Sequence, residues 1–289
     1  MKTVFIAGAT GYLGGYLCRT YKARGWRVIA LVRDAARAEH LTADLLVEAE
    51  ATRPDTLKGV LHGAEVVVSA LGITRQADGV GYWDVDYQAN INLLAEAEKC
   101  GVRHFGYVHV LNADQMPHVA LVAAKSAFVR KLRLSRIAST VIAPSGYFSD
   151  LGDFLDMARK GRVWLFGSGA QRLNPIHGAD LADAICDAIE QDVRWLDVGG
   201  PQVFTQNDLA QMCFEVLEKP ARVTHLPDIL RRGLLRALPL ILPGRFAGPP
   251  QFFLTALGMD MVGNPCGTHT LKDHFDQRAL DAETQGGFG

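Results

Sequence analysis

Gly8-Ala9-Thr10-Gly11-Tyr12-Leu13-Gly14 is the stretch of sequence that decides the fold. A short apolar run, residues 4–7, precedes this turn, and a helical pattern over residues 12–24 follows it. Glycines at every third position between a strand and a helix are typical of a dinucleotide-binding turn. The first glycine permits the tight turn, the second lets a pyrophosphate approach the backbone, and the third lets the helix pack on the strand. The chain is therefore expected to open with a Rossmann-type unit.

The start of the helix completes the predicted phosphate site. Its first backbone N–H groups and the positive end of its dipole point toward the turn and stabilise an anion there. Thr10 would add a hydroxyl donor. The residues of this turn that we expect to contact a dinucleotide are Gly8, Thr10, Gly11, Tyr12, Leu13 and Gly14.

The end of the second predicted strand, residues 27–32, selects between NAD and NADP. NAD-binding proteins place a carboxylate there on the ribose 2′-OH, whereas NADP-binding proteins place an arginine on the 2′-phosphate. Arg33 follows the strand and can bind a phosphate with two hydrogen bonds, and Arg37 is a second candidate contact. Asp34 would favour NAD if the strand ended one residue later. The sequence predicts NADP(H), with NAD(H) as the alternative.

Strand and helix patterns alternate through the rest of the first half. Further strands are predicted over residues 45–49, 65–70, 104–111 and 140–143, and helices over residues 85–100 and 119–136. Ala51 follows the third strand, and Ala70, Leu71 and Gly72 follow the fourth, where a bound cofactor would cross the strand ends. Continuous apolar strands separated by helices predict a doubly wound parallel sheet with helices on both faces.

The second half is less regular. Helices are predicted over residues 151–160, 179–190 and 206–217, the last with Thr205 as its N-cap, and strands over residues 162–166 and 195–198. No low-complexity linker divides the chain. We expect a single NAD(P)-binding α/β domain over residues 1–289. Its Rossmann core would comprise about 1–145 and 177–199, and a smaller C-terminal substrate lobe would comprise about 146–176 and 200–289.

Composition excludes several classes. The chain has 289 residues, a formal net charge of −1 and no block of Lys or Arg, which argues against nucleic-acid binding. Five scattered cysteines without a C-x-x-C pair, and no signal-peptide pattern, favour a reduced protein of the cytoplasm. The apolar stretch 234–257 is interrupted by prolines, so no integral membrane segment is predicted. We interpret this stretch as part of a lobe or lid, with a membrane-surface segment as the alternative.

The chain resembles the short-chain dehydrogenase/reductase superfamily. It is most similar to the atypical branch that includes NmrA-like proteins, isoflavone-reductase-like enzymes and divinyl chlorophyllide reductases. Besides the glycine turn, the resemblance rests on residues 66–72, 86–90, 125–126, 144–148 and on Asn174-Pro175-Ile176-His177-Gly178-Ala179-Asp180-Leu181-Ala182. It covers residues 1 to about 218.

The resemblance also identifies a missing catalytic group. Classical members use a Ser/Tyr/Lys set, and Lys125 matches the lysine that holds the nicotinamide ribose. Leu121 stands four residues earlier, where the tyrosine should be, and His109 stands where the serine often is. The absence of that tyrosine argues against classical alcohol dehydrogenase chemistry.

Isoflavone-reductase-like enzymes work with the lysine and without that tyrosine. The resemblance therefore implies that NADPH reduces a polarised double bond in a small, partly apolar substrate. Lys125, or a water that it holds, would supply the proton, or Lys125 would hold the ribose only. His109 is a candidate acid because an ordinary histidine has a pKa of about 6.5. Pro144 would contact the cofactor, and Tyr147 would line the substrate pocket.

A second class of function stays open. NmrA-like regulators, photosystem assembly factors and an accessory subunit of respiratory complex I share this fold and lack the tyrosine. The alternative is a non-catalytic NADP(H)-binding regulatory or assembly protein whose C-terminal lobe binds a protein partner. Arg75 and Trp83 are either surface residues or substrate contacts. Cys266, His269 and His274 are three loosely spaced ligands without a fourth, so we predict no metal site.

Overall fold

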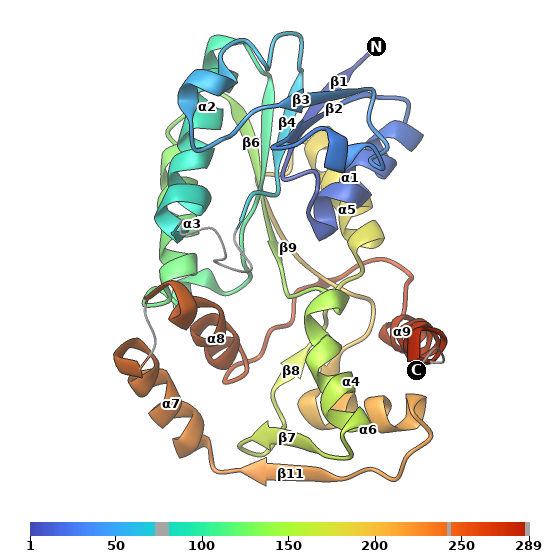
Figure 1. The fold of residues 1–289 in the computed structure, drawn as a ribbon. Helices are drawn as coiled ribbons and strands as arrows, with labels where there is room; N and C mark the ends of the chain where they lie inside the picture. The colour runs from blue at the N-terminus through green and yellow to red at the C-terminus, as the bar shows by residue number, and fades with distance from the viewer. Residues whose placement is uncertain (73–80, 242–243, 287–289) are drawn as a thin grey trace.

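A parallel sheet forms the centre of the molecule. The computed structural model describes residues 1–72, 81–241 and 244–286. Eight strands pair in the order β12-β9-β6-β5-β4-β1-β2-β3 (Figure 1). Their bounds are β1 Thr3–Ala7, β2 Arg27–Val32, β3 Leu45–Glu48, β4 Val66–Ser69, β5 His104–Val108, β6 Ala138–Pro144, β9 Trp195–Gly199 and β12 Asn264–Pro265. Every neighbouring pair is parallel, so all the carboxyl ends lie at one edge.

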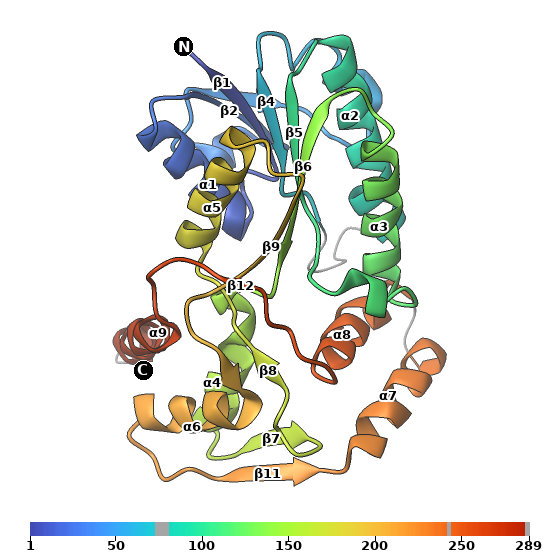
Figure 2. The ribbon, with the colours of Figure 1, turned by 180° about the vertical axis from the view of Figure 1, so that it is seen from behind.

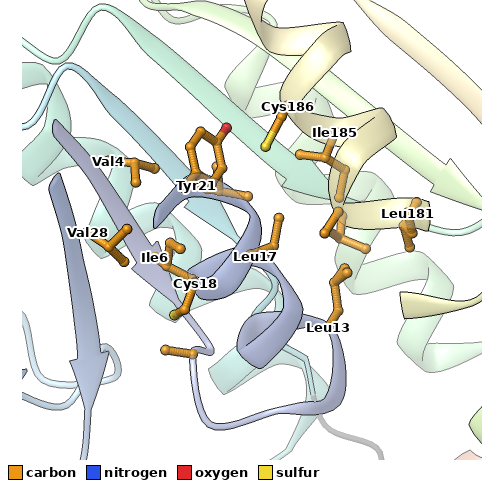
Figure 3. Close-up of a cluster of buried hydrophobic side chains, with 14 of the residues drawn as sticks. Val4, Ile6, Leu13, Leu17, Cys18, Tyr21, Val28, Leu181, Ile185 and Cys186 are labelled. Carbon is orange, nitrogen blue, oxygen red and sulfur yellow. The ribbon is translucent and has the colours of Figure 1, made fainter. Parts of the chain in front are cut away.

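Helices cover both faces of this sheet, as the sequence predicted. One face carries α1 (Tyr12–Ala23) and α5 (Gly178–Glu190), and the other carries α2 (Asn90–Lys99) and α3 (Ala120–Leu132), as Figures 1 and 2 show. Leu13 and Leu17 of α1 face Leu181 and Ile185 of α5 above β1 and β2 (Figure 3). The sheet is apolar along whole strands because both faces are buried.

A smaller lobe lies beyond the carboxyl ends of the strands (Figure 2). Its elements are α4 Gly152–Arg159, β7 Val163–Phe166, β8 Arg172–Leu173, β10 Phe204–Thr205, α6 Gln206–Val216, β11 Val223–Leu226, α7 Asp228–Ile241, α8 Gly244–Ala256 and α9 Leu271–Gly286. Phe148, Phe214 and Phe275 belong to its own apolar core. Thr205 caps α6 as predicted, because its side chain accepts from the Asp208 N–H.

The structure contains elements that the sequence did not predict, namely β8, β10, β11, β12 and α9, and it differs from two of the interpretations given above. The helix expected over residues 85–100 begins as a π-helix, Trp83–Ala89, before α2. The buried Asn90 amide donates to the carbonyls of Val85 and Asp86, which holds the wider turn. Within the proline-broken stretch 234–257, residues 234–241 belong to the helix α7 and residues 244–256 form the helix α8, and these helices contain Pro239, Pro249 and Pro250.

Short 3-10 turns also lie between some of the regular elements. Single 3-10 turns occur at Ala36–Ala38, Pro54–Leu57, Ala113–Gln115 and Phe148–Leu151. Within the described ranges, no helix combines the length and apolar composition that a membrane crossing requires.

Candidate functional site

The glycine turn packs against the end of β4. Gly8 has φ +83°, and a Cβ on it would lie 2.8 Å from the Ala70 carbonyl oxygen. A Cβ on Gly14 would lie 2.1 Å from the Gly8 carbonyl oxygen, so α1 approaches the turn as closely as glycine allows. The Gly11 N–H donates to the Gly8 carbonyl at 3.0 Å and closes the turn.

The amino end of α1 is built to receive an anion. Gly11 is its N-cap, no side chain caps the helix, and its first turn holds no acidic residue. The first-turn N–H groups therefore stay available to phosphate oxygens. The Tyr12 hydroxyl accepts from the Gly178 N–H at 3.1 Å, which ties the turn to α5. A hollow of about 280 Å³ beside the turn is lined by Ala9, Thr10, Gly11, Tyr12, Gly15, Tyr16, Arg19, His40, Leu41 and Thr42.

The end of β2 presents charged side chains. Arg33 and Asp34 are exposed directly after the strand. The Asp34 carboxylate accepts from the Arg37 backbone N–H at 3.3 Å and lies 3.3 Å from the Arg37 Nε. Asp34 is thus engaged by its own loop.

The other expected cofactor contacts lie at the same edge of the sheet. Ala51 follows β3, and its carbonyl accepts from the Asn92 side chain at 3.0 Å. The Ala70 N–H donates to the Ala7 carbonyl at 2.9 Å. Leu71 and Gly72 continue from β4 toward Lys125, and a Cβ on Gly72 would lie 3.3 Å from the Lys125 Nζ. The strand ends therefore gather these residues as a dinucleotide-binding edge requires.

Lys125 is buried at this edge. Its Nζ donates to the Val108 carbonyl at 3.1 Å and lies 3.2 Å from the Asp86 Oδ1. The Leu71 carbonyl is 3.5 Å away, and the ammonium stands over the Tyr107 ring at 5.3 Å. A buried cation needs such partners, because burial without them is costly. The ammonium is held at the ends of β4 and β5.

Tyr82 is a neighbour of this pair that the sequence analysis missed. Its hydroxyl is buried and has no hydrogen-bond partner within the described residues. Burial, and secondly the charge of Asp86, raise its pKa to about 12. A Cβ on Gly248 of α8 would lie 2.5 Å from this hydroxyl. The available signal was the spacing of four residues between Tyr82 and Asp86 on one helical segment.

His109 is buried directly after β5. Burial, followed by the charges of Lys125 and Arg133, lowers its pKa to about 3. Its Nε2 lies 3.4 Å from the Ser126 Oγ, and its ring meets the edge of Trp195 with centroids 5.9 Å apart. His109 is a neutral imidazole near pH 7, which disfavours the acid role expected from an ordinary pKa.

Tyr147 faces the glycine turn. Its ring centroid lies 5.7 Å from that of Tyr12. Burial, and then the charge of Asp150, raise its pKa. Pro144 ends β6 just before it, and the Pro144 carbonyl accepts from the Leu111 N–H at 3.2 Å. Tyr147 is thus placed over the cofactor turn, with a hydroxyl that stays protonated at neutral pH.

The position of the missing tyrosine lies in an apolar wall. Leu121 packs with the buried cluster that holds Val122, Met116 and Met261. Phe252 and Ala256 of α8 pack on the same cluster. The lobe therefore covers this part of α3 with hydrocarbon, and a substrate here would meet apolar surface.

A second groove lies on the other side of α3, between that helix and β9. It has a volume of about 680 Å³ and is lined by Trp83, His109, Asn112, Ala113, Asp114, Pro117, Ala123, Ser126, Val129, Arg130, Arg133, Trp195 and Asp197. Trp83 is 52% exposed, and Arg75 lies outside the described residues. None of the glycine-turn residues lines this groove.

Comparison with known proteins agrees with this geometry. The sequence model of the NAD(P)H-binding family matches residues 8–192, more than half of the chain. The chain belongs to the NAD(P)H-binding family. This NAD(P)H-binding protein is 29% identical over 252 residues to the chloroplastic divinyl chlorophyllide a 8-vinyl-reductase of Zea mays, covering 78% of this chain and 62% of the relative. It therefore spans less than two thirds of that relative's length.

Two further similarities extend the picture. The photosystem II assembly factor Ycf39 of Synechocystis sp. is 24% identical over 236 residues, covering 79% of this chain and 72% of the relative. An NADPH-dependent quinone oxidoreductase of Escherichia coli, solved with NADPH, matches with a TM-score of 0.72 at 20% identity, covering 96% of this chain and 99% of that chain. The relatives confirm the resemblance to the atypical branch, and the solved structure confirms the fold.

Proposed function

We propose that this NAD(P)H-binding protein is an NADPH-dependent reductase of a small, partly apolar molecule. The observation that carries the proposal is the Lys125 ammonium, held by Asp86 and the Val108 carbonyl beside Gly72. A buried cation at the carboxyl ends of two central strands lies where a reacting ring would cross the sheet. We infer that the Lys125 ammonium is a proton donor held in a fixed position, in contrast to a charge on the protein surface.

The residues of the turn fit a dinucleotide. A Cβ on Gly8 or on Gly14 would clash with backbone, and the first turn of α1 has no side-chain cap. The turn therefore leaves its N–H groups to an anion. Gly8, Thr10, Gly11, Tyr12, Leu13 and Gly14 would hold the pyrophosphate. When bound, NADPH supplies a hydride to the substrate.

We propose NADP(H) rather than NAD(H) because of how Asp34 is engaged. The carboxylate that would receive a ribose 2′-OH is paired with Arg37. Arg33 stands exposed at the strand end and would bind a 2′-phosphate, with Arg37 beside it. An unpaired Asp34 carboxylate would repel the 2′-phosphate. The ion pair of Asp34 with Arg37 lowers this repulsion.

Lys125 would deliver the proton that balances the reduction. The ion pair with the Asp86 carboxylate would hold the Lys125 ammonium in one position, although a lysine side chain is flexible in itself. Leu121 and Phe252 would exclude water from the apolar side of the site. Tyr147 would close it on the side of Tyr12. Burial, and secondly the charge of Asp86, raise the pKa of Tyr82, so its hydroxyl stays protonated near the ion pair.

The test is a panel of apolar quinones and α,β-unsaturated ketones, followed by NADPH oxidation. We expect turnover of at least one class, lost in Lys125→Ala. Lys272→Ala is the matched control, because Lys272 is an exposed lysine paired with Asp276 on α9. A panel without turnover, together with one stoichiometric protein captured on the chain, would reject the reductase.

That outcome would favour the second candidate, an NADP(H)-binding assembly or regulatory protein. The observation in its favour is Leu121 in place of the tyrosine, under the apolar cover of α8. The similarity to Ycf39, named as an assembly factor, supports it too. We propose the C-terminal lobe as the partner surface in that case.

The five cysteines are unpaired, which supports our placement of the protein in a reducing compartment such as the cytoplasm.

A further inference from the structure

The helix α7 carries large apolar side chains that face solvent. The exposed fractions are 69% for Ile229, 49% for Leu230, 45% for Leu234, 88% for Leu240 and 72% for Ile241. Isolated exposed apolar residues are ordinary, but five on one helix form a patch. We call these five side chains the α7 apolar face.

The spacing of the α7 apolar face makes it one continuous arc. At about 100° per residue the five side chains fall within roughly 140° of the helix circumference. Gly233 and Ala237 fall in the same arc and do not interrupt it. Arg236 and Arg232 follow at about 20° and 60° beyond the Ile229 edge. A surface helix normally turns its apolar side toward the core, whereas the apolar arc of α7 points toward solvent.

The opposite side of α7 is attached to the lobe. Arg231 donates to Asp228 at 2.6 Å and to the Leu254 carbonyl of α8 at 2.9 Å. A Cβ on Gly258 would lie 2.3 Å from the Arg231 guanidinium, so the contact is close. Figures 1 and 2 both show α7 at the outside of the lobe, away from the central sheet. The apolar face is thus presented outward by a fixed helix.

The charge of α7 is positive. It contains Arg231, Arg232 and Arg236 against Asp228 alone, so three positive charges and one negative give +2, whereas the whole chain carries −1. Asp228 is bound by Arg231 and by Arg232 at 2.8 Å. Arg236 makes no hydrogen bond or ion pair within the described residues and stands at the edge of the apolar arc.

We propose that α7 docks on an anionic lipid surface. The α7 apolar face would lie at the boundary between headgroups and acyl chains, and Arg232 and Arg236 would meet the lipid phosphates. A second copy is a poorer occupant, because two such helices would bring their arginines together without an acidic side chain on the arc. The docking holds whether or not the protein is a reductase.

The experiment is sedimentation of the full chain with vesicles. Vesicles of phosphatidylcholine and phosphatidylglycerol are compared with vesicles of phosphatidylcholine alone. We expect binding to the anionic vesicles only, weakened about fivefold for each of Arg232→Gln and Arg236→Gln. The double variant Leu234→Gln/Leu240→Gln should lose binding by about tenfold or more.

A matched control separates the helix from general stickiness. Leu134 is 81% exposed at the end of α3, and Leu134→Gln should leave vesicle binding unchanged. The α7 variants should stay folded, because α7 has no fully buried side chain. Thermal denaturation checks this for each variant. Absence of binding to anionic vesicles, or equal loss in Leu134→Gln, overturns the proposal. A concentration-dependent dimer in sedimentation velocity that Leu240→Gln abolishes overturns it in favour of a second copy.

Discussion

The Asp86 Oδ1 lies 3.2 Å from the Lys125 Nζ, and both side chains are buried at the carboxyl edge of the sheet. The pair joins the π-helix to α3 across the end of β5. Removal of one partner leaves a buried charge without compensation, and this is costlier than loss of an exposed pair.

Asp86→Asn is therefore expected to lower the free energy of unfolding by about 3–5 kcal/mol. Urea denaturation at pH 7 measures it. Asp276→Asn breaks the exposed pair with Lys272 and should have no measurable effect. If Asp86→Asn is as mild as Asp276→Asn, the ion pair does not stabilise the fold. The double variant Asp86→Asn/Lys125→Met should recover part of the loss.

Gly14→Ala should abolish NADPH binding and destabilise the fold, because the new Cβ would lie 2.1 Å from the Gly8 carbonyl oxygen. Gly15 is the matched control, since a Cβ there meets no atom within 4 Å. Gly15→Ala should keep NADPH binding and raise stability by up to about 1 kcal/mol through helix propensity. NADPH fluorescence titration and thermal denaturation report both. Equal behaviour of the two variants would contradict the described turn.

Arg33→Ala should weaken NADPH binding by about ten- to a hundredfold, the range expected for lost hydrogen bonds to a charged group. NADH binding should change little, because NADH lacks the 2′-phosphate. Arg136→Ala removes an exposed arginine after α3 and serves as the control. Tighter binding of NADH than of NADPH, unaffected by Arg33→Ala, would show that the protein selects NAD(H).

The titration of His109 should make stability depend on pH. Its pKa falls from an ordinary 6.5 to about 3 on folding, so between those values the unfolded chain holds a proton that the folded chain lacks. Stability is therefore complete above pH 6.5 and is lost as pH falls toward 3, by up to about 1.4 kcal/mol per pH unit. His109→Gln should flatten this slope relative to wild type, and exposed His118→Gln should not. Equal slopes in all three proteins would contradict the burial of His109.

The fold was predictable where the signals are local. The glycine turn, the apolar strands and the Thr205 cap are each written in a few consecutive residues, and the structure confirms them. β12 was not predictable, because two residues at 264–265 join the sheet only through pairing with β9. The helices α7 and α8 were missed because internal prolines normally end a helix, while packing against the lobe sustains these.

The candidate site, like the fold, was predictable only where a local sequence motif marks a residue. A motif supplied Lys125, but its pairing with Asp86 spans 39 positions and depends on the π-helix that Asn90 holds open. The acid role expected of His109 assumed an ordinary pKa, and burial under Trp195 was not visible in a pattern. Tyr82 offered only its four-residue spacing from Asp86, because the contact with Gly248 of α8 that covers its ring comes from a distant part of the sequence.

The rate of NADPH oxidation with an apolar electron acceptor, measured for wild type, Lys125→Arg and Lys125→Ala, tests most directly whether Lys125 donates the proton. All three proteins are first checked for NADPH binding by fluorescence. Lys125→Ala should lower turnover by about a hundredfold or more, the scale of a lost proton donor. Lys125→Arg keeps the positive charge but lacks an easily lost proton, so it should lower turnover as well. Turnover that survives intact in Lys125→Ala would contradict a proton-donor role of Lys125.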